Sequence, residues 1–140
     1  MFPKSDKQLQ LTVGNSDQRI TRAGRFLRKY KIDELPQLIN VLKGDMSMVG
    51  PRPEVRKYVD LYTPEQQRVL TVKPGITDRA SIEFRNENEL LAAATNPESY
   101  YIREILPRKL QLNLEYIERQ SLALDLKLIF QTVYSVFLNR

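Results

Sequence analysis

The chain has 140 residues, of which 41% are hydrophobic and 28% charged. This balance is typical of one globular domain that can bury a core, rather than of a disordered chain. The sequence contains no cysteine and no histidine. Disulfides, thiolate nucleophiles, ordinary zinc sites and a histidine general base are therefore excluded. Any chemistry must use Asp, Glu, Lys, Arg, Tyr, Ser or Thr.

The positive charge is concentrated in the N-terminal part of the chain. The whole sequence has a net charge of +5, whereas residues 1–32 hold eight Lys or Arg against two Asp, which gives +6. Such a segment favours an anionic partner: a nucleotide, a nucleic acid or a phospholipid surface. The residues after Met1 lack the apolar core of a signal peptide. No uncharged apolar run reaches the ~18–20 residues that cross a bilayer.

The first predicted elements are a short strand at Leu9–Val13 and a helix from Thr21 to about Tyr30. Thr21 is a suitable N-cap, and apolar residues follow it at i, i+3, i+4 and i+7. Six cations and no acid lie between Arg19 and Lys31. This basic face is either solvated, as most charge runs are, or it binds an anion.

A second helix is predicted from Asp33 to Gly44. Pro36 is tolerated in its first turn, and Gly44 is a natural C-terminal stop. Helical spacing predicts a buried stripe on this helix, formed by Leu35, Leu38, Ile39 and Leu42. Asp33 and Glu34 then lie at a helix N-terminus, where negative charge is stabilised. They either cap the helix, or they form a carboxylate pair that can hold a divalent metal or attack phosphorus.

A stiff turn follows at Gly50-Pro51-Arg52-Pro53. Two prolines fix the local backbone and hold Arg52 in a narrow range of orientations. A guanidinium held in this way suits a bidentate contact with a phosphate. The alternative is a loop arginine braced for packing.

The remainder of the chain is predicted to be mostly helical. The expected elements are helices at Pro53–Leu61, from the Thr63–Gln66 capping box to Leu70, at Glu87–Thr95, at Glu98–Glu118 with a break near Pro107, and at Leu122–Leu138 after a Ser121 cap, with a turn at Lys73–Thr77 and a short strand at Ala80–Phe84. The fold class is therefore mainly α with a few short β-strands (α+β), in a compact single domain. The last helix is apolar on most of its surface. It is either a core helix or one that docks on a membrane surface or a partner.

Three motifs in the same order along the chain resemble those of the bacterial sugar transferase family, the monotopic polyprenyl-phosphate phosphoglycosyl transferases. The motifs are Asp33-Glu34-Leu35-Pro36-Gln37-Leu38, Asn40-Val41-Leu42-Lys43-Gly44-Asp45-Met46-Ser47 and Val49-Gly50-Pro51-Arg52-Pro53. The resemblance extends upstream through Arg19–Arg22 and Gly24–Arg28. Downstream it takes in Lys73–Thr77 and Asp125–Phe130 with Thr132. It thus covers nearly the whole chain from about residue 17.

The resemblance implies transfer of a sugar 1-phosphate from a UDP-sugar to undecaprenyl phosphate, with release of UMP, at the start of capsule, O-antigen or exopolysaccharide synthesis. It makes Asp33 the nucleophile that forms a covalent phosphosugar intermediate, and it gives Glu34 a role with Mg²⁺. Both members of this dyad are candidate metal ligands. The expected substrate-binding residues are Arg25, Arg28, Arg52 and Lys73.

The chain departs from the family pattern in two places. Family members carry a re-entrant membrane helix before the region matched here, so residues 1–140 are expected to be a catalytic domain that is N-terminally truncated relative to the family. Many members also have Gly and an aromatic residue where this chain has Asp78 and Arg79. Because the matched region lacks the membrane helix, we expect a peripheral protein on the cytoplasmic face of the inner membrane. No nucleic-acid partner is expected, since the basic segment has no recognised nucleic-acid-binding motif. The alternative is an inactive homologue that acts as a nucleotide-sugar-binding module.

Overall fold

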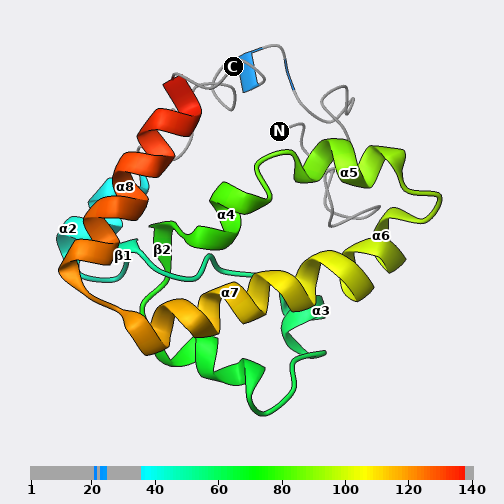
Figure 1. Cartoon of the computed structure of the whole chain (residues 1–140), viewed down its shortest axis with the longest axis horizontal. Coiled ribbons are helices and arrows are strands. Elements are labelled where there is room, and N and C mark those ends of the chain that lie inside the picture. Colours follow the sequence, from blue (N-terminus) through cyan, green and yellow to red (C-terminus); the bar gives the residue numbers. More distant parts are fainter. Residues whose placement is uncertain (1–20, 22, 25–35, 138–140) are drawn as a thin grey trace.

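The computed structural model describes residues 21, 23–24 and 36–137 (Figure 1). The elements along the continuous part are α2 (Gln37–Lys43), β1 (Ser47–Val49), α3 (Arg56–Val59), the 3₁₀ helix η3 (Gln66–Thr71), β2 (Gly75–Thr77), α4 (Arg79–Glu83), α5 (Glu87–Ala93), α6 (Pro97–Tyr100), the π-helical turn η4 (Tyr101–Ile105), α7 (Leu106–Arg119) and α8 (Leu122–Phe137). The predicted class, mainly α with a few short strands, is confirmed. The predicted strand at Leu9–Val13 lies outside the described residues. So does the predicted first helix beyond Gly24, although the Gly24 N–H donates to Thr21 Oγ1 at 3.0 Å, as its N-cap requires.

Helix α7 is the centre of the core. It crosses the middle of the domain, with η3 on one side and α4 on the other (Figure 1). The larger apolar cluster joins α7 and the turn before it to the α3–η3 segment and α5. Its buried members are Tyr58, Tyr62, Val69, Leu91, Tyr101, Ile105, Leu106 and Leu110. A smaller cluster of Val49, Tyr116 and Leu128 attaches β1 and α8 to the far end of α7.

The strands β1 and β2 form a two-stranded parallel sheet, with Ser47 opposite Gly75 and Val49 opposite Thr77. The sheet is tied to α8 because Thr77 Oγ1 and Thr132 Oγ1 share a hydrogen bond of 2.6 Å. It joins two segments that are far apart in the sequence, and it therefore sets the position of the turns that follow each strand.

Most helix ends lie where the side chains predict them. Gly44 ends α2 in the left-handed region at φ 82°, and its N–H bonds back into the helix. In the capping box, the Thr63 N–H donates to Gln66 Oε1 at 2.9 Å and the Gln66 N–H donates to Thr63 Oγ1 at 3.3 Å. The Leu124 N–H donates to Ser121 Oγ at 3.3 Å, which confirms the cap of α8. The break or kink predicted near Pro107 is found as an irregularity only: the π-helical turn η4 ends at Ile105, and the chain stays helical through Pro107 in the first turn of α7.

Three predicted elements differ from those in the structure. Residues 80–84 were expected as a strand but belong to helix α4, because Asp78 accepts a hydrogen bond from the Ser81 N–H and caps that helix. The helix expected at Pro53–Leu61 is only the short α3, since Val55 is still extended at ψ 145°. The turn expected at Lys73–Thr77 is also partly strand, because its last three residues form β2.

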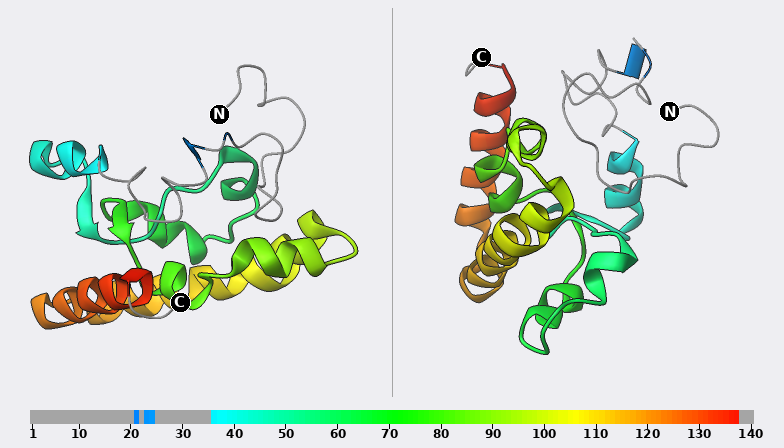
Figure 2. Two further views of the ribbon diagram at one scale, coloured as in Figure 1. Left: turned by 90° about the horizontal axis from the view of Figure 1, so that it is seen from above. Right: turned by 90° about the vertical axis from the view of Figure 1, so that its right-hand side faces the viewer.

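The predicted buried stripe of α2 is also wrong for the residues that the structure describes. Leu38, Ile39 and Leu42 are exposed, the last of them by 87%. The physical reason is placement: among the described elements α2 mainly contacts β1, and in both views of Figure 2 it stands apart from α7 and α8.

Helix α8 is neither a core helix nor a free one. One face packs on the sheet and on α4, through Leu128 and its neighbours. The opposite face carries a stripe of exposed apolar side chains, which we call the α8 stripe: Leu122, Leu126, Phe130, Val133 and Tyr134. Among the described residues, no helix is both long and apolar enough to traverse a bilayer.

Candidate functional site

The Pro-Arg-Pro turn is held by a close contact between two glycines. A Cβ built on Gly75 would lie 2.1 Å from the Gly50 nitrogen, and one on Gly50 would lie 2.7 Å from the Lys73 carbonyl oxygen. Neither position can therefore carry a side chain. The Gly50 N–H donates to Thr77 O at 3.0 Å, and the Gly75 N–H donates to Pro51 O at 3.1 Å. We call this joined pair of turns the glycine clasp. It fixes the backbone immediately before Arg52.

Asp78 continues this restraint beyond the glycines. Its side chain is buried, with only 2% of the residue exposed. The Arg52 N–H donates to Asp78 Oδ2 at 3.3 Å, and the Ser81 N–H donates to Asp78 Oδ1 at 2.5 Å. One carboxylate thus binds the Arg52 backbone and caps α4. Asp78 therefore has a clear structural role in this chain. The following residue, Arg79, forms an ion pair with Glu115 at 2.9 Å.

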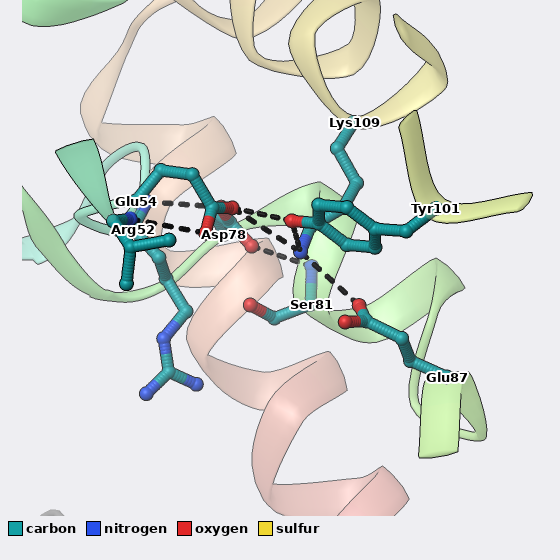
Figure 3. Close-up of polar contacts among 8 residues, drawn as sticks. Arg52, Glu54, Asp78, Ser81, Glu87, Tyr101 and Lys109 are labelled. Carbon is teal, nitrogen blue, oxygen red and sulfur yellow. Dashed lines mark hydrogen bonds and ion pairs between the residues drawn. The ribbon is translucent and has the colours of Figure 1, made fainter. Parts of the chain in front are cut away.

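A second polar cluster lies just after the turn (Figure 3). Tyr101 Oη donates to Glu54 Oε2 at 2.5 Å. Lys109 Nζ donates to Glu87 Oε2 at 3.1 Å and lies 4.0 Å from Glu54 Oε2. Burial raises the pKa of the Tyr101 hydroxyl, and the neighbouring Glu54 carboxylate raises it further. The cluster is therefore a fixed charge arrangement that joins the turn to α5, η4 and α7.

A cavity of about 190 Å³ opens between these two groups. Arg52, Glu54, Asp78, Lys109 and Asn113 line it together with apolar side chains of η3 and α7. Sequence reasoning missed Glu54, Lys109 and Asn113 as site residues. A signal existed for Asn113: it takes a core position on α7, three residues after Leu110 and three before Tyr116.

The structure locates two of the residues predicted to form the site. Arg52 lines the cavity. Lys73 does not line the cavity. Its side chain extends toward the C-terminal end of α2, where Nζ is 3.8 Å from a Cβ built on Gly44. A cation is stabilised there by the helix dipole. A role for Lys73 in substrate binding stays a prediction.

The other predicted site residues, Arg25, Arg28, Asp33 and Glu34, lie outside the described residues. In the sequence the Asp33-Glu34 dyad comes shortly before α2, the helix that leads into β1 and the turn. Within the described part of the chain, no three acidic side chains gather into a possible metal site.

Comparison with known proteins identifies the family. The family model for the bacterial sugar transferases matches residues 1–139. The chain is 45% identical over 121 residues to an uncharacterized sugar transferase, EpsL, of Bacillus subtilis, covering 86% of this chain and 52% of that protein. It is 40% identical to the UDP-glucose:undecaprenyl-phosphate glucose-1-phosphate transferase of Klebsiella pneumoniae, over 100% of this chain and 28% of the relative. The protein of that name from Escherichia coli is 37% identical, over 98% and 28%.

The chain spans about half of the first of these relatives and about a quarter of the other two. The matched region includes the turn, the sheet and the α7–α8 segment described above. The chain belongs to the bacterial sugar transferase family.

Proposed function

We propose that the chain transfers a sugar 1-phosphate from a UDP-sugar to undecaprenyl phosphate, in two steps through a covalent aspartyl intermediate. The observation that carries the proposal is the family match over nearly the whole chain. The relatives named as glucose-1-phosphate transferases of undecaprenyl phosphate support the substrate classes. The rigid turn that presents Arg52 supports binding of a phosphorylated donor.

In the first step, an Asp33 carboxylate oxygen attacks the phosphorus next to the sugar. The bond from that phosphorus to the bridging oxygen breaks, and UMP leaves with the electron pair. In the second step, a phosphate oxygen of undecaprenyl phosphate attacks the same phosphorus and displaces Asp33. The product is a sugar linked to the lipid through a diphosphate. Neither step needs a histidine, which agrees with a chain that has none.

The residues around the dyad would neutralise the negative charge of the donor. Adjacent carboxylates are ligands that Mg²⁺ accepts together with diphosphate oxygens, so Asp33 and Glu34 fit a magnesium ion. When bound, Mg²⁺ would offset the charge of the diphosphate. Arg52, with Arg25 and Arg28 from the basic segment, would stabilise charge on the transferred phosphoryl group and on the leaving UMP.

The test is the single change Asp33→Asn, with Asp60→Asn as the matched acid-to-amide control at an exposed position outside the family motifs. We expect UMP release from a UDP-sugar to fall by orders of magnitude in Asp33→Asn and to stay unchanged in the control. Intact-mass spectrometry after incubation with UDP-glucose should show a sugar phosphate adduct on the wild type but not on Asp33→Asn. Turnover near the wild-type rate in Asp33→Asn would refute the role of this residue.

The alternative, an inactive nucleotide-sugar-binding module, makes a different prediction in the same assay. It would bind UDP-glucose without releasing UMP and without forming the adduct, even when undecaprenyl phosphate is present. Adduct formation by the wild type decides in favour of the enzyme.

We also propose that the chain acts at a membrane surface, since its acceptor is a lipid. The α8 stripe presents apolar side chains along one helix face, and residues 1–32 carry a charge of +6. Apolar contact together with attraction to anionic lipids gives reversible, salt-sensitive binding. The expected location is the cytoplasmic face of the inner membrane, where UDP-sugars are available.

A further inference from the structure

One residue in the wall of the cavity beside the turn has a buried polar atom without a hydrogen-bond partner among the described residues. Asn113 lies on α7 and lines the cavity, with only 6% of the residue exposed. Its Oδ1 atom has no hydrogen-bond partner in the described part of the chain. A buried acceptor without a partner is costly, and native proteins contain few of them. Oδ1 itself has almost no accessible surface, but rotation of the Asn113 amide about its last side-chain torsion would present this acceptor to the cavity that the side chain lines, where a ligand would donate a hydrogen bond to it.

The size and walls of the cavity limit what that ligand can be. Its volume of about 190 Å³ is well below the ~300–1,000 Å³ of pockets that enclose a drug-sized ligand. One ring of a nucleotide sugar is therefore the largest part that fits. Tyr62, Val69, Leu106 and Leu110 form apolar walls. These walls suit a flat heterocycle with apolar faces. The polar side chains of Glu54, Asp78 and Lys109 in the lining already have protein partners, so a hexose would leave several hydroxyl groups unpaired.

The charges of the site point to the same part of the donor. The carboxylates of Glu54 and Asp78 line the cavity and would repel a phosphate within it. Lys109 is already paired with Glu54 and Glu87. The Arg52 guanidinium points away from this cluster (Figure 3), so a phosphate bound by it would lie apart from the carboxylates. The cavity thus favours a neutral ring, with the phosphate held by Arg52.

We infer that the cavity binds the uracil ring of the nucleotide and that Asn113 is the residue that recognises the base. Uracil is flat and neutral, and its N3–H is a donor flanked by two carbonyl acceptors. Asn113 Oδ1 would accept from N3–H, while the amide nitrogen of the same side chain donates to a ring carbonyl. The inference rests on the proposed function, and it assigns a residue to the base rather than to the reacting phosphate.

Titration calorimetry of the full chain with UMP and with ribose 5-phosphate separates the two contacts. The wild type should bind UMP more tightly than ribose 5-phosphate, which has the phosphate and sugar but no base. Asn113→Leu should weaken UMP binding by about tenfold or more and leave ribose 5-phosphate unaffected. Arg52→Lys should weaken both. Gln111→Leu, a matched change at an exposed position of the same helix, should weaken neither.

The outcomes distinguish this inference from the function on which it rests. Equal affinity of the wild type for UMP and ribose 5-phosphate, or unchanged UMP affinity in Asn113→Leu, would overturn the uracil site while UMP release by the wild type continued. Absence of both UMP binding and UMP release in the wild type would overturn the proposed function as well.

The stability of Asn113→Leu provides a second readout. Because Oδ1 has no partner among the described residues, the Asn113→Leu variant, with a side chain of similar size, should fold at least as stably as the wild type. If this variant does not fold, Leu70→Trp tests the same site from an exposed wall position, where a larger ring narrows the cavity. Leu70→Trp should lower UMP affinity more than ribose 5-phosphate affinity. Unchanged UMP affinity in Leu70→Trp would overturn the assignment.

Discussion

The two long C-terminal helices differ in a way that their composition does not suggest. Helix α7 contains several charged residues but buries five side chains: Leu106, Leu110, Leu112, Asn113 and Tyr116. Helix α8 has only Asp125 and Lys127 as charged residues, yet Leu128 is its single buried side chain among those that the structure describes. On α7 the apolar residues share one face, whereas on α8 they surround most of the helix. Segregation of apolar residues therefore decides which helix enters the core, and the surplus on α8 remains available for another surface.

The largest effect on the free energy of unfolding is expected at Leu112 of α7, which is fully buried at 0% exposure. Leu112→Ala leaves a cavity on the core side of α7, so we expect a loss of roughly 2–5 kcal/mol in the free energy of unfolding. Urea denaturation followed by circular dichroism measures it. Leu122→Ala on the exposed face of α8 is the matched control, with an expected change within about 0.5 kcal/mol. Equal losses in the two variants would contradict the comparison.

The hydrogen bond that joins the two helices is a smaller target. Tyr116 Oη on α7 donates to Asp125 Oδ1 on α8 at 2.6 Å. Tyr116→Phe removes this bond, keeps the ring and leaves a carboxylate with one partner fewer. We expect a loss of about 1–3 kcal/mol in the free energy of unfolding, again from urea denaturation. An unchanged value would mean that packing around Leu128, rather than this bond, attaches α8.

High pH should lower the free energy of unfolding, because tyrosines in the larger apolar cluster around α7 lose their protons. Burial, with a smaller contribution from nearby carboxylates, raises the pKa of Tyr58 and of Tyr62 from 10.0 to about 12. The folded state keeps these protons when the unfolded chain has lost them. Their contribution to stability is therefore complete below pH 10 and is lost as the pH rises from 10 to 12. The urea concentration at the midpoint of unfolding should be similar at pH 8 and pH 10 and lower at pH 11. Tyr62→Phe should reduce that fall, and an identical fall in this variant would contradict the assignment.

The smallest effect on folding is expected on the α8 stripe, where the effect on membrane binding should be large. Phe130 is 71% exposed, so Phe130→Ser should change the free energy of unfolding by no more than about 0.5 kcal/mol. Flotation with anionic liposomes should nevertheless lose most of the bound protein, because the apolar contact area shrinks. Leu61→Ser, at an exposed apolar position between α3 and η3, is the matched control and should leave flotation unchanged. Flotation of Phe130→Ser at the wild-type level would exclude the stripe as the membrane contact.

The sequence was most informative where one side chain determines the local structure. Gly44, the Thr63–Gln66 box and Ser121 each predicted a helix end that the structure contains. It was least informative where distant contacts decide. The sheet has two strands of three residues each, too short for an alternating pattern to be recognised. Helix α4 depends on the Asp78 cap, which was not recognised.

The candidate site shows the same division. The rigid presentation of Arg52 could be predicted from its two prolines. The cavity beside it could not, because its walls come from η3, α7 and the turn itself, which the chain brings together over more than fifty residues of sequence. Asn113 is recognisable as unusual only once its neighbours on the core face of α7 are known.

The glycine clasp has a consequence for engineering this domain. The clasp holds the two ends of the segment from Pro51 to Pro74 together next to the sheet. Both ends of this segment therefore have fixed positions. The residues between, from Tyr62 to Val72, supply much of one side of the cavity wall. Exchange of residues 62–72 with the corresponding segment of a relative should therefore replace this wall while Arg52 stays in position. The clasp makes the segment a transplantable cassette, in which the cavity wall can be varied while the backbone at Arg52 stays in place.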